Sequence, residues 1–208
     1  MSGAKSSIEI DKDVVDRLIR HIEENSTDMV EENLHVPAAH FLSRERLAAE
    51  LALLRRLPLI AGFGSELHEP GSFITRDILG IGLILVRRSD GGIACFRNMC
   101  RHRGGRLENE PSGKKALFTC QYHGWSYERE SGALAGIPQS KVFGDIDRGC
   151  HGLESFRAEE RQGLIFVWLT DGENESLGDF LGDTLEAQLA RWAFQRSVVH
   201  IDRTFDLE

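Results

Sequence analysis

The residues with the clearest chemical potential are two short pairs of cysteine and histidine near the middle of the chain. Cys100 and His102 form the first pair, and Cys120 and His123 form the second pair after 17 intervening residues. A cysteine and a histidine two or three positions apart on a tight loop can direct both side chains at one metal centre. Two such loops can close around that centre from opposite sides, so the spacing predicts a metal site with two thiolate and two imidazole ligands.

Two kinds of metal site remain open for this ligand set. One is a tetrahedral zinc site, and the other is a Rieske-type [2Fe–2S] cluster, in which two cysteines hold one iron and two histidines hold the other. Zinc sites usually combine pairs of like ligands, whereas each loop here supplies one ligand of each type, which favours the two-iron cluster. Gly104, Gly105 and Gly124 follow the pairs and permit the sharp turns and close backbone approach that such loops need.

Composition narrows the class of protein. The chain has 208 residues, with 25 Lys and Arg against 33 Asp and Glu, for a net charge of −8. This acidic balance argues against a nucleic-acid-binding protein. The first ten residues lack the apolar run of a secretory signal, and the longest nearly apolar runs, 57–64 and 79–86, are under half the length that spans a bilayer. We therefore expect a cytoplasmic protein with no membrane partner.

The elements that would position the two pairs can be read from hydrophobic periodicity. Apolar residues at helical spacing predict an amphipathic helix over about 12–24, a second helix that starts after Ser43 and ends near Pro58, and a third over 176–194. Residues 197–205 alternate as in a strand. Short apolar or β-branched runs predict six further strands, at 73–79, 82–87, 93–97, 116–120, 125–127 and 164–169. The sequence thus predicts an antiparallel β module over about 58–170, flanked by helices.

Residues 98–105 (Asn-Met-Cys-Arg-His-Arg-Gly-Gly) and 120–127 (Cys-Gln-Tyr-His-Gly-Trp-Ser-Tyr) closely resemble the Rieske domain of the large (alpha) subunits of ring-hydroxylating oxygenases. The likeness extends over about 40–170. It implies a mainly β Rieske fold, with antiparallel sheets and a small cluster-binding subdomain. Residues 1–39 and 171–208 match only loosely. From their periodicity we expect a helical segment over 1–39, and a helix and strand over 171–208 that lead into a catalytic domain absent from this chain.

The resemblance implies that Cys100, His102, Cys120 and His123 ligate a Rieske-type [2Fe–2S] cluster. It adds further cofactor-binding residues around them, namely Arg103, Gly104, Gly124 and Trp125. It assigns no catalytic residue to this chain.

High-potential Rieske proteins carry an additional disulfide between their cluster loops, and the corresponding positions here are Gly105 and Tyr122. They also carry a serine hydrogen-bonded to a cluster sulfur, where this chain has Trp125. We therefore expect a reduction potential toward the low end of the Rieske range, which spans about −150 to +300 mV.

Several side chains near the two pairs have more than one interpretation. A basic cluster could dock an acidic ferredoxin or reductase, or could pair with nearby carboxylates; it consists of Arg97, Arg101, Arg103 and Arg106. We expect Trp125 and Tyr122 to shield the metal site from water, and Cys95 and Cys150 to be buried as small apolar residues. The remaining histidines lack ligand-type spacing, so we assign them no metal.

In the full-length protein, the resemblance implies an oxidoreductase. Electrons would come from a ferredoxin or flavin reductase and leave through the imidazole of His102 or His123. They would reach a mononuclear Fe(II) in the C-terminal catalytic domain or in a neighbouring alpha subunit, as in trimeric family members.

After His123 the sequence has only His151 and His200, without the paired spacing of an iron site. This chain alone is therefore expected to lack hydroxylase activity, either dioxygenase or monooxygenase. The alternatives are a free-standing Rieske-type ferredoxin and a zinc-stabilised interaction module.

Overall fold

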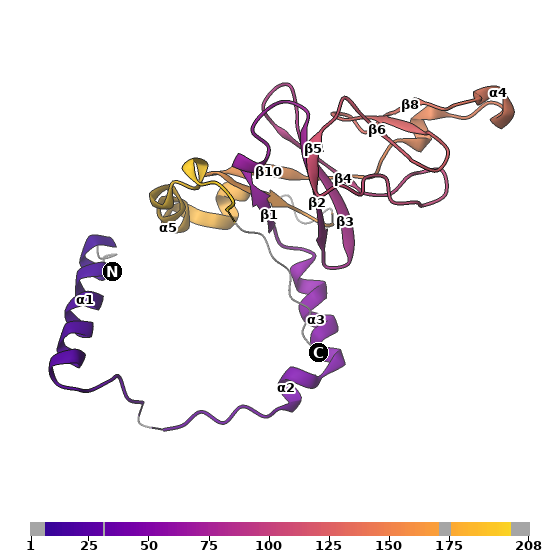
Figure 1. Cartoon of the computed structure of the whole chain (residues 1–208). Coiled ribbons are helices and arrows are strands. Elements are labelled where there is room, and N and C mark those ends of the chain that lie inside the picture. Colours follow the sequence, from indigo (N-terminus) through magenta and orange to yellow (C-terminus); the bar gives the residue numbers. More distant parts are fainter. Residues whose placement is uncertain (1–6, 31, 171–175, 201–208) are drawn as a thin grey trace. The chain divides into compact units, whose positions relative to one another are not determined.

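The computed structural model describes residues 7–30, 32–170 and 176–200 (Figure 1). The chain separates into two units, Met1–Ser43 and Arg44–Glu208. In the first unit, helix α1 spans Ser7–Glu23 and the four-residue helix α2 spans Ala39–Leu42. The helix predicted over 12–24 is confirmed and begins earlier. The segment after α1 folds back onto it, because Asp28 lies 2.9 Å from Nε2 of His21.

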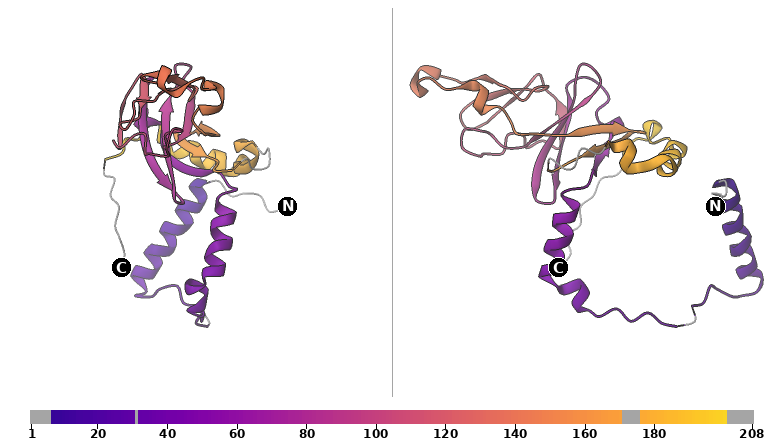
Figure 2. Two further views of the ribbon diagram at one scale, coloured as in Figure 1. Left: turned by 90° about the vertical axis from the view of Figure 1, so that its right-hand side faces the viewer. Right: turned by 180° about the vertical axis from the view of Figure 1, so that it is seen from behind.

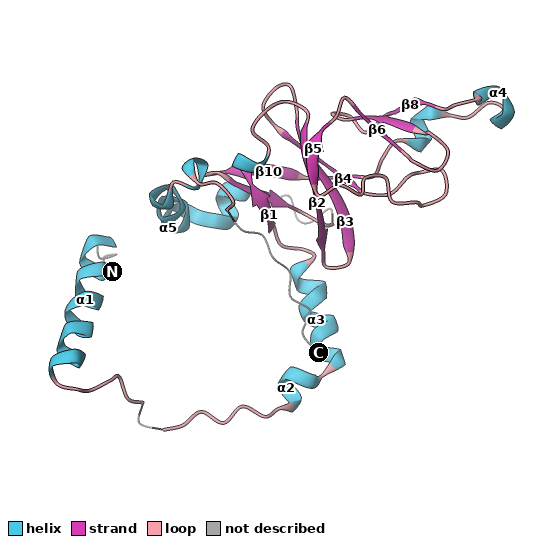
Figure 3. Cartoon of the chain, in the orientation of Figure 1, coloured by secondary structure: helices cyan, strands magenta, loops and turns pink. Residues whose placement is uncertain are grey.

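The second unit begins with helix α3 (Arg44–Leu54), as predicted, and continues into a β-rich region (Figure 3). Its strands form three antiparallel sheets with the orders β5-β2-β3-β4-β9, β1-β11-β10 and β6-β7-β8. The first sheet contains β5 (Ser112–Lys114), β2 (Ser72–Ile78), β3 (Ile81–Arg87), β4 (Ile93–Arg97) and β9 (Ser155–Phe156). The second contains β1 (Leu59–Phe63), β11 (Leu164–Val167) and β10 (Ala158–Arg161). The third contains β6 (Leu117–Thr119), β7 (Ser126–Glu128) and β8 (Leu134–Gly136).

The six runs predicted as strands in the β module all form strands, and the mainly β fold is confirmed. The five strands that the sequence pattern did not reveal are short or only partly apolar: β1, β5, β8, β9 and β10. Their pairing depends on partners far away in the chain, which a local pattern does not report.

The central sheet is buried on both faces. Successive residues of a strand point to opposite sides, so one strand can contribute side chains to a core on each face. In β3, Ile84 and Val86 face a core that includes Phe118 and Tyr127 of the third sheet. Leu83 and Leu85 face a second core that includes residues of β11. The central sheet therefore supports a layer on each side, and the layer built from β6, β7 and β8 carries one of the two Cys–His loops.

Two Cys–His loops extend from these sheets. The first Cys–His loop (residues 100–105) follows β4, and the second (residues 120–125) joins β6 to β7. Helix α4 (Ser140–Phe143) and the 3-10 helix η2 (Arg148–His151) come after β8. In Figures 1 and 2, α4 and helix α5 (Leu177–Trp192) lie at opposite ends of the unit.

Helix α5 confirms the helix predicted over 176–194. The Ser176 side chain accepts a hydrogen bond from the Asp179 N–H at 3.0 Å and caps the helix. Leu177 and Leu181 pack against β11 and its extension. A bend at Gly182, whose φ is +64°, interrupts the helix.

The strand predicted over 197–205 is wrong for residues 197–200, which follow the 3-10 helix η3 (Phe194–Arg196) in irregular conformation. A strand requires a neighbouring ladder, and the three sheets within 59–167 do not extend to these residues. Residues 201–205 lie outside the described part of the chain.

Candidate metal centre

The two Cys–His loops share one backbone hydrogen-bond pattern. The amide N–H of Cys100 donates to the carbonyl oxygen five residues later at 2.8 Å, and the N–H of Cys120 does the same at 2.8 Å. In both loops the N–H group four residues after the cysteine donates back to the cysteine carbonyl oxygen, and both of these distances are 2.9 Å. The loops are therefore similar closed turns, although their histidines stand at different offsets from the cysteine.

The residue four positions after each cysteine is a glycine for a conformational reason. Gly104 has a φ of +73° and Gly124 a φ of +70°, in the left-handed region that other residues rarely adopt. A Cβ on Gly124 would also lie 2.7 Å from Cγ of Pro138. The predicted need for glycine at these two positions follows from backbone conformation and, at Gly124, from close packing as well.

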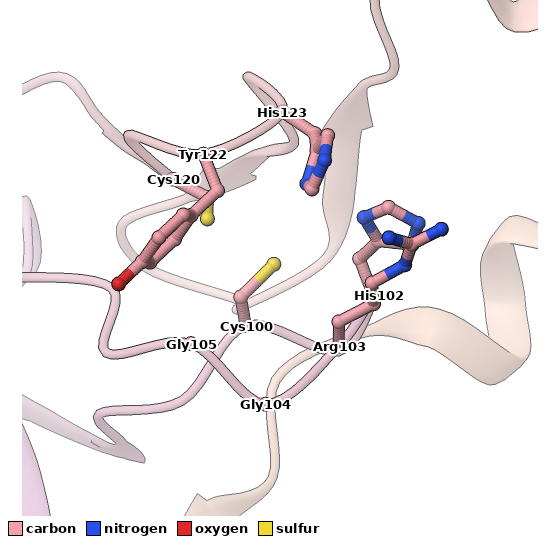
Figure 4. A pocket seen from close by; sticks show the side chains of 8 residues that line it. All are labelled: Cys100, His102, Arg103, Gly104, Gly105, Cys120, Tyr122 and His123. Atoms are coloured by element: carbon pink, nitrogen blue, oxygen red, sulfur yellow. The ribbon is translucent and has the colours of Figure 1, made fainter.

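The two cysteines form a buried pair whose sulfur atoms face the same space (Figure 4). Burial raises the pKa of the Cys100 thiol, and the neighbouring Cys120 thiol raises it further. Hydrogen bonds from the Tyr127 hydroxyl and the His102 backbone act in the opposite direction. A cation beside this pair would favour the deprotonated thiolates.

The two histidines form a second pair, opposite the sulfur atoms. The ring centroids of His102 and His123 are 4.8 Å apart, with an interplanar angle of 83°. His102 is half-buried because its other face stacks on Trp125, at 4.8 Å between centroids and an interplanar angle of 11°. Burial and the neighbouring His123 lower the pKa of His102, which keeps the imidazole neutral and able to bind a metal.

These side chains surround one cavity of about 300 Å³ (Figure 4). Its lining includes all four predicted ligands as well as Arg103 and Gly104; the full set is Cys100, His102, Arg103, Gly104, Gly105, Cys120, Tyr122 and His123. The other two predicted site residues lie just outside it. Trp125 is behind the His102 ring, and Gly124 forms the turn beneath Pro138.

The donors fit a two-iron cluster because they occur as two pairs of like atoms. Within residues 7–30, 32–170 and 176–200, no three His, Cys, Asp or Glu side chains converge to hold a single ion. A [2Fe–2S] cluster of the Rieske type needs only two protein ligands at each iron, sulfur at one and nitrogen at the other. The thiol pair and the imidazole pair on opposite sides of the cavity match that requirement.

Tyr127 is a site residue that the sequence analysis did not single out. Its hydroxyl lies 3.3 Å from the Cys100 sulfur and accepts the Arg101 N–H at 3.0 Å. Burial, followed by the contact with Cys100, raises the pKa of this phenol strongly, so it remains protonated. The position of Tyr127 in the sequence offered one signal. Tyr127 lies in β7, two residues after Trp125, and its side chain belongs to the face of the strand that points into the core.

The basic cluster divides into two groups. Arg97 pairs with Glu154 at 2.5 Å and Arg106 with Asp77 at 3.3 Å, so both hold structure. Arg101 and Arg103 are exposed, and Arg103 lines the cavity. The pairing interpretation is confirmed for Arg97 and Arg106, and docking through Arg101 and Arg103 stays a prediction.

Two further expectations concern cysteines outside the loops. Cys95 is buried, as predicted, and burial raises its pKa to about 12. The expectation that Cys150 is buried is wrong. Cys150 is exposed on η2, where its thiol donates to Oδ2 of Asp147 at 3.1 Å. The N-cap Asp147 draws this segment into a short turn at the surface, so the thiol does not reach the core.

A buried polar clamp holds the base of the first Cys–His loop. The side chain of Asn98 donates to the Glu108 carbonyl at 2.8 Å and accepts the N–H groups of Leu107 and Glu108. The buried Glu108 carboxylate accepts the N–H groups of Asn109 and Glu110 and pairs with Lys115. The entry and exit of the loop are thus joined by buried hydrogen bonds, whose loss is costly.

Comparison with known families identifies the centre. The family model described as "Rieske [2Fe-2S] domain" matches residues 59–157, which include both Cys–His loops. These residues are a Rieske [2Fe–2S] domain. Its cofactor is a Rieske-type [2Fe–2S] cluster, and the zinc interpretation is wrong.

The proteins that this chain resembles in sequence are oxygenase subunits. It is 38% identical over 133 residues to the glycine betaine monooxygenase oxygenase subunit of Chromohalobacter salexigens, covering 64% of this chain and 29% of the relative. It is 39% identical over 123 residues to the large oxygenase component of the naphthalene 1,2-dioxygenase system of Pseudomonas fluorescens, covering 57% and 27%. The chain thus spans less than a third of the length of these two relatives.

Solved structures give the same result. Naphthalene 1,2-dioxygenase from Rhodococcus sp. bound to indole superposes with a TM-score of 0.66 at 30% identity, covering 74% of this chain and 35% of that one. The quaternary ammonium Rieske monooxygenase CntA in complex with L-carnitine gives a TM-score of 0.66 at 25% identity, covering 74% and 44%.

These matches confirm the predicted resemblance to Rieske oxygenase alpha subunits and favour it over a free-standing ferredoxin. The relatives are dioxygenases and monooxygenases, which are oxidoreductases. Among the described helices, none is both long and apolar enough to cross a bilayer.

Proposed function

We propose that this chain is the electron-transfer part of a Rieske oxygenase alpha subunit. Cys100 and Cys120 would hold one iron, and His102 and His123 the other. The observation that carries this assignment is the separation of thiols and imidazoles into two pairs around one cavity (Figure 4). When bound, the cluster would supply reversible storage of one electron.

The surrounding residues orient the ligands and exclude water. Trp125 covers one face of His102 and holds the plane of its ring. Gly104 and Gly124 make the turns that bring each histidine back over the cavity. Arg103 lines the mouth and adds positive charge there. These four residues act on the site without supplying a metal-binding atom.

The outer surface of the site favours a partner with negative charge. His123 is exposed and lines the same cavity as Arg103, and Arg101 is exposed in the same loop as Arg103, in a chain whose net charge is −8. Opposite charges speed encounter and set orientation more than they raise affinity. An acidic ferredoxin, or an acidic flavin reductase, would therefore dock with its redox group near the imidazole edge.

The electron acceptor would be a mononuclear Fe(II) site; in the described ranges 7–30, 32–170 and 176–200, no three ligand-type side chains gather to hold one. In the whole protein that iron would belong to a C-terminal catalytic domain, or to a neighbouring alpha subunit of a trimer. The relatives include both a glycine betaine monooxygenase and a naphthalene dioxygenase, so the function shared by the matched region is electron delivery rather than substrate choice. We also propose a cytoplasmic location.

The cofactor assignment is tested on the purified 208-residue chain. About two iron and two acid-labile sulfide atoms per chain are expected, with a rhombic EPR signal after reduction. Cys120→Ser and His123→Ala should each abolish that signal, whereas the matched controls Cys150→Ser and His35→Ala should retain it. A full signal in either ligand variant would contradict the assignment.

Docking is tested by the rate of reduction with a reduced acidic [2Fe–2S] ferredoxin. Replacing Arg101 and Arg103 with glutamine should slow the reaction about tenfold at low salt and reduce its dependence on ionic strength. The control Arg88→Gln, on the hairpin at the opposite end of β4, should leave the rate unchanged. Equal rates in all three proteins would contradict this docking surface.

A further inference from the structure

Tyr122 has an unusual combination of exposure and contact. Its side chain is 74% exposed, so burial does not explain a large aromatic ring at this position. The ring nevertheless lines the cavity together with both cysteines. In Figure 4 it lies on the cysteine side of the site, away from the two imidazole rings.

The ring of Tyr122 crosses from its own loop to the other loop. Tyr122 belongs to the second Cys–His loop, yet a Cβ on Gly105 of the first loop would lie 2.9 Å from both Cδ2 and Cε2 of the ring. The ring edge therefore rests directly on the α-carbon of Gly105. The carbonyl of Gly105 accepts the Cys100 N–H at 2.8 Å, so this contact reaches the backbone that holds a ligand.

The glycine at position 105 is explained by this contact and not by its backbone conformation. Gly104 and Gly124 have positive φ values, whereas Gly105 is absent from the set of positive-φ glycines. The three atoms nearest to a Cβ at Gly105 all belong to Tyr122. A side chain here would be compatible with the backbone but would push the ring away.

We propose that Tyr122 is a positioning residue that clasps the two Cys–His loops together at the cysteine end of the site and shields the sulfur atoms from water. The clasp consists of the ring edge on the α-carbon of Gly105 and needs no covalent bond.

Two measurable consequences follow. Separation of the loops should expose the ligand sulfur atoms and speed the loss of iron to a chelator. Water beside the sulfur atoms should also stabilise the more negative, reduced form of the site, so the reduction potential should rise. A change in loop stability alone would alter the first quantity and not the second.

The experiment compares Tyr122→Ala, Tyr122→Phe and Gly105→Ala in the full chain carrying its cluster. Loss of visible absorbance in excess chelator should be about fivefold faster in Tyr122→Ala, and a dye-mediated titration should show a higher potential. Gly105→Ala should reproduce both changes because its Cβ displaces the ring. Tyr122→Phe keeps the ring and should behave as the wild type.

Wild-type values of either quantity in Tyr122→Ala would overturn the proposal, as would a phenylalanine variant that behaves like the alanine variant. The inference rests on the proposed function, because the clasp acts on the loops of the cluster site. Failure of the clasp and failure of the proposed function give different experimental results. Absence of iron and sulfide from the wild-type chain contradicts the cluster ligation, whereas an unchanged Tyr122→Ala protein contradicts only the clasp.

Discussion

The hydroxyl oxygen of Tyr127 lies 3.3 Å from the sulfur of Cys100 and accepts the amide N–H of Arg101 at 3.0 Å. A metal-bound thiolate carries no proton, so in the loaded site the phenol must donate. The tyrosine thus orients a loop amide and would supply a hydrogen bond to the Cys100 sulfur when that sulfur binds iron. The low potential predicted from sequence considered only positions 105, 122 and 125, and it stays a prediction.

Tyr127→Phe should lower the reduction potential. A hydrogen bond to sulfur stabilises the reduced, more negative cluster, and its loss removes up to about 0.5–1.5 kcal/mol, or about 20–65 mV for one electron. Dye-mediated titration measures the change. Tyr122→Phe removes the other tyrosine hydroxyl of the chain and should leave the potential unchanged. An equal potential in Tyr127→Phe and the wild type would show that this bond does not tune the site.

Cys150 should react with alkylating reagents more slowly than an ordinary exposed thiol. Its hydrogen bond to the Asp147 carboxylate raises the pKa of the thiol, so less thiolate is present at pH 8. Asp147→Asn should therefore speed alkylation at pH 8, and the two rates should converge at high pH, where both thiols are ionised.

Cys95 gives the internal reference for that measurement in the loaded protein. Burial raises its pKa to about 12, so it should stay unmodified until the chain unfolds. Mass spectrometry of tryptic peptides separates the two sites. Equal rates for the wild type and Asp147→Asn at pH 8 would contradict the role of the carboxylate.

Glu154→Gln should destabilise the domain at neutral pH but not in acid. The hydrogen bond from Arg97 lowers the pKa of Glu154, and this pair joins β4 to the segment before β9. A lowered folded-state pKa adds stability above the unfolded value of about 4.3, and that stability is lost as the pH falls through the folded value. Both side chains are partly exposed, so solvent screening limits the loss to about 0.5–1 kcal/mol.

Urea unfolding at pH 7 and pH 4 measures this difference, which should shrink at the lower pH. Glu45→Gln, at an exposed position in α3, is the control and should have little effect at either pH. A constant difference between Glu154→Gln and the wild type at both values would show that the ion pair is not its source.

Gly124→Ala should destabilise the domain more than Gly91→Ala. Both glycines have positive φ, +70° and +86°, so alanine costs about 1–2 kcal/mol at either position. Gly91 faces open space, but a Cβ on Gly124 meets Pro138 at 2.7 Å, which adds about 1–3 kcal/mol. Thermal unfolding and iron content should both report the larger defect in Gly124→Ala. Equal losses in the two variants would remove Pro138 from the explanation.

The sequence was most informative where function and local pattern coincide. The two Cys–His loops could be found because Cys–His spacing reports a loop directly, and β2, β3 and β4 could be found because their apolar runs are long. Tyr127 was missed because its contact with Cys100 joins residues 27 positions apart. The position of Cys150 depends on a cap from Asp147, and the conformation of residues 197–200 depends on the absence of a neighbouring strand within the sheets described. Long-range pairing decides the cases of Tyr127 and residues 197–200, whereas the Asp147 cap is a local contact that an apolar pattern does not report.

The closed hydrogen-bond pattern of the two Cys–His loops has a consequence for the order of events in biogenesis. Each loop is closed by its own main-chain bonds and by glycine turns, none of which involves a metal atom. Zinc fingers, in contrast, fold only when their ion binds. Because these bonds join residues of the same loop, we expect each Cys–His loop to keep its closed backbone without the cluster. Polypeptide folding and cofactor insertion would then be separable steps.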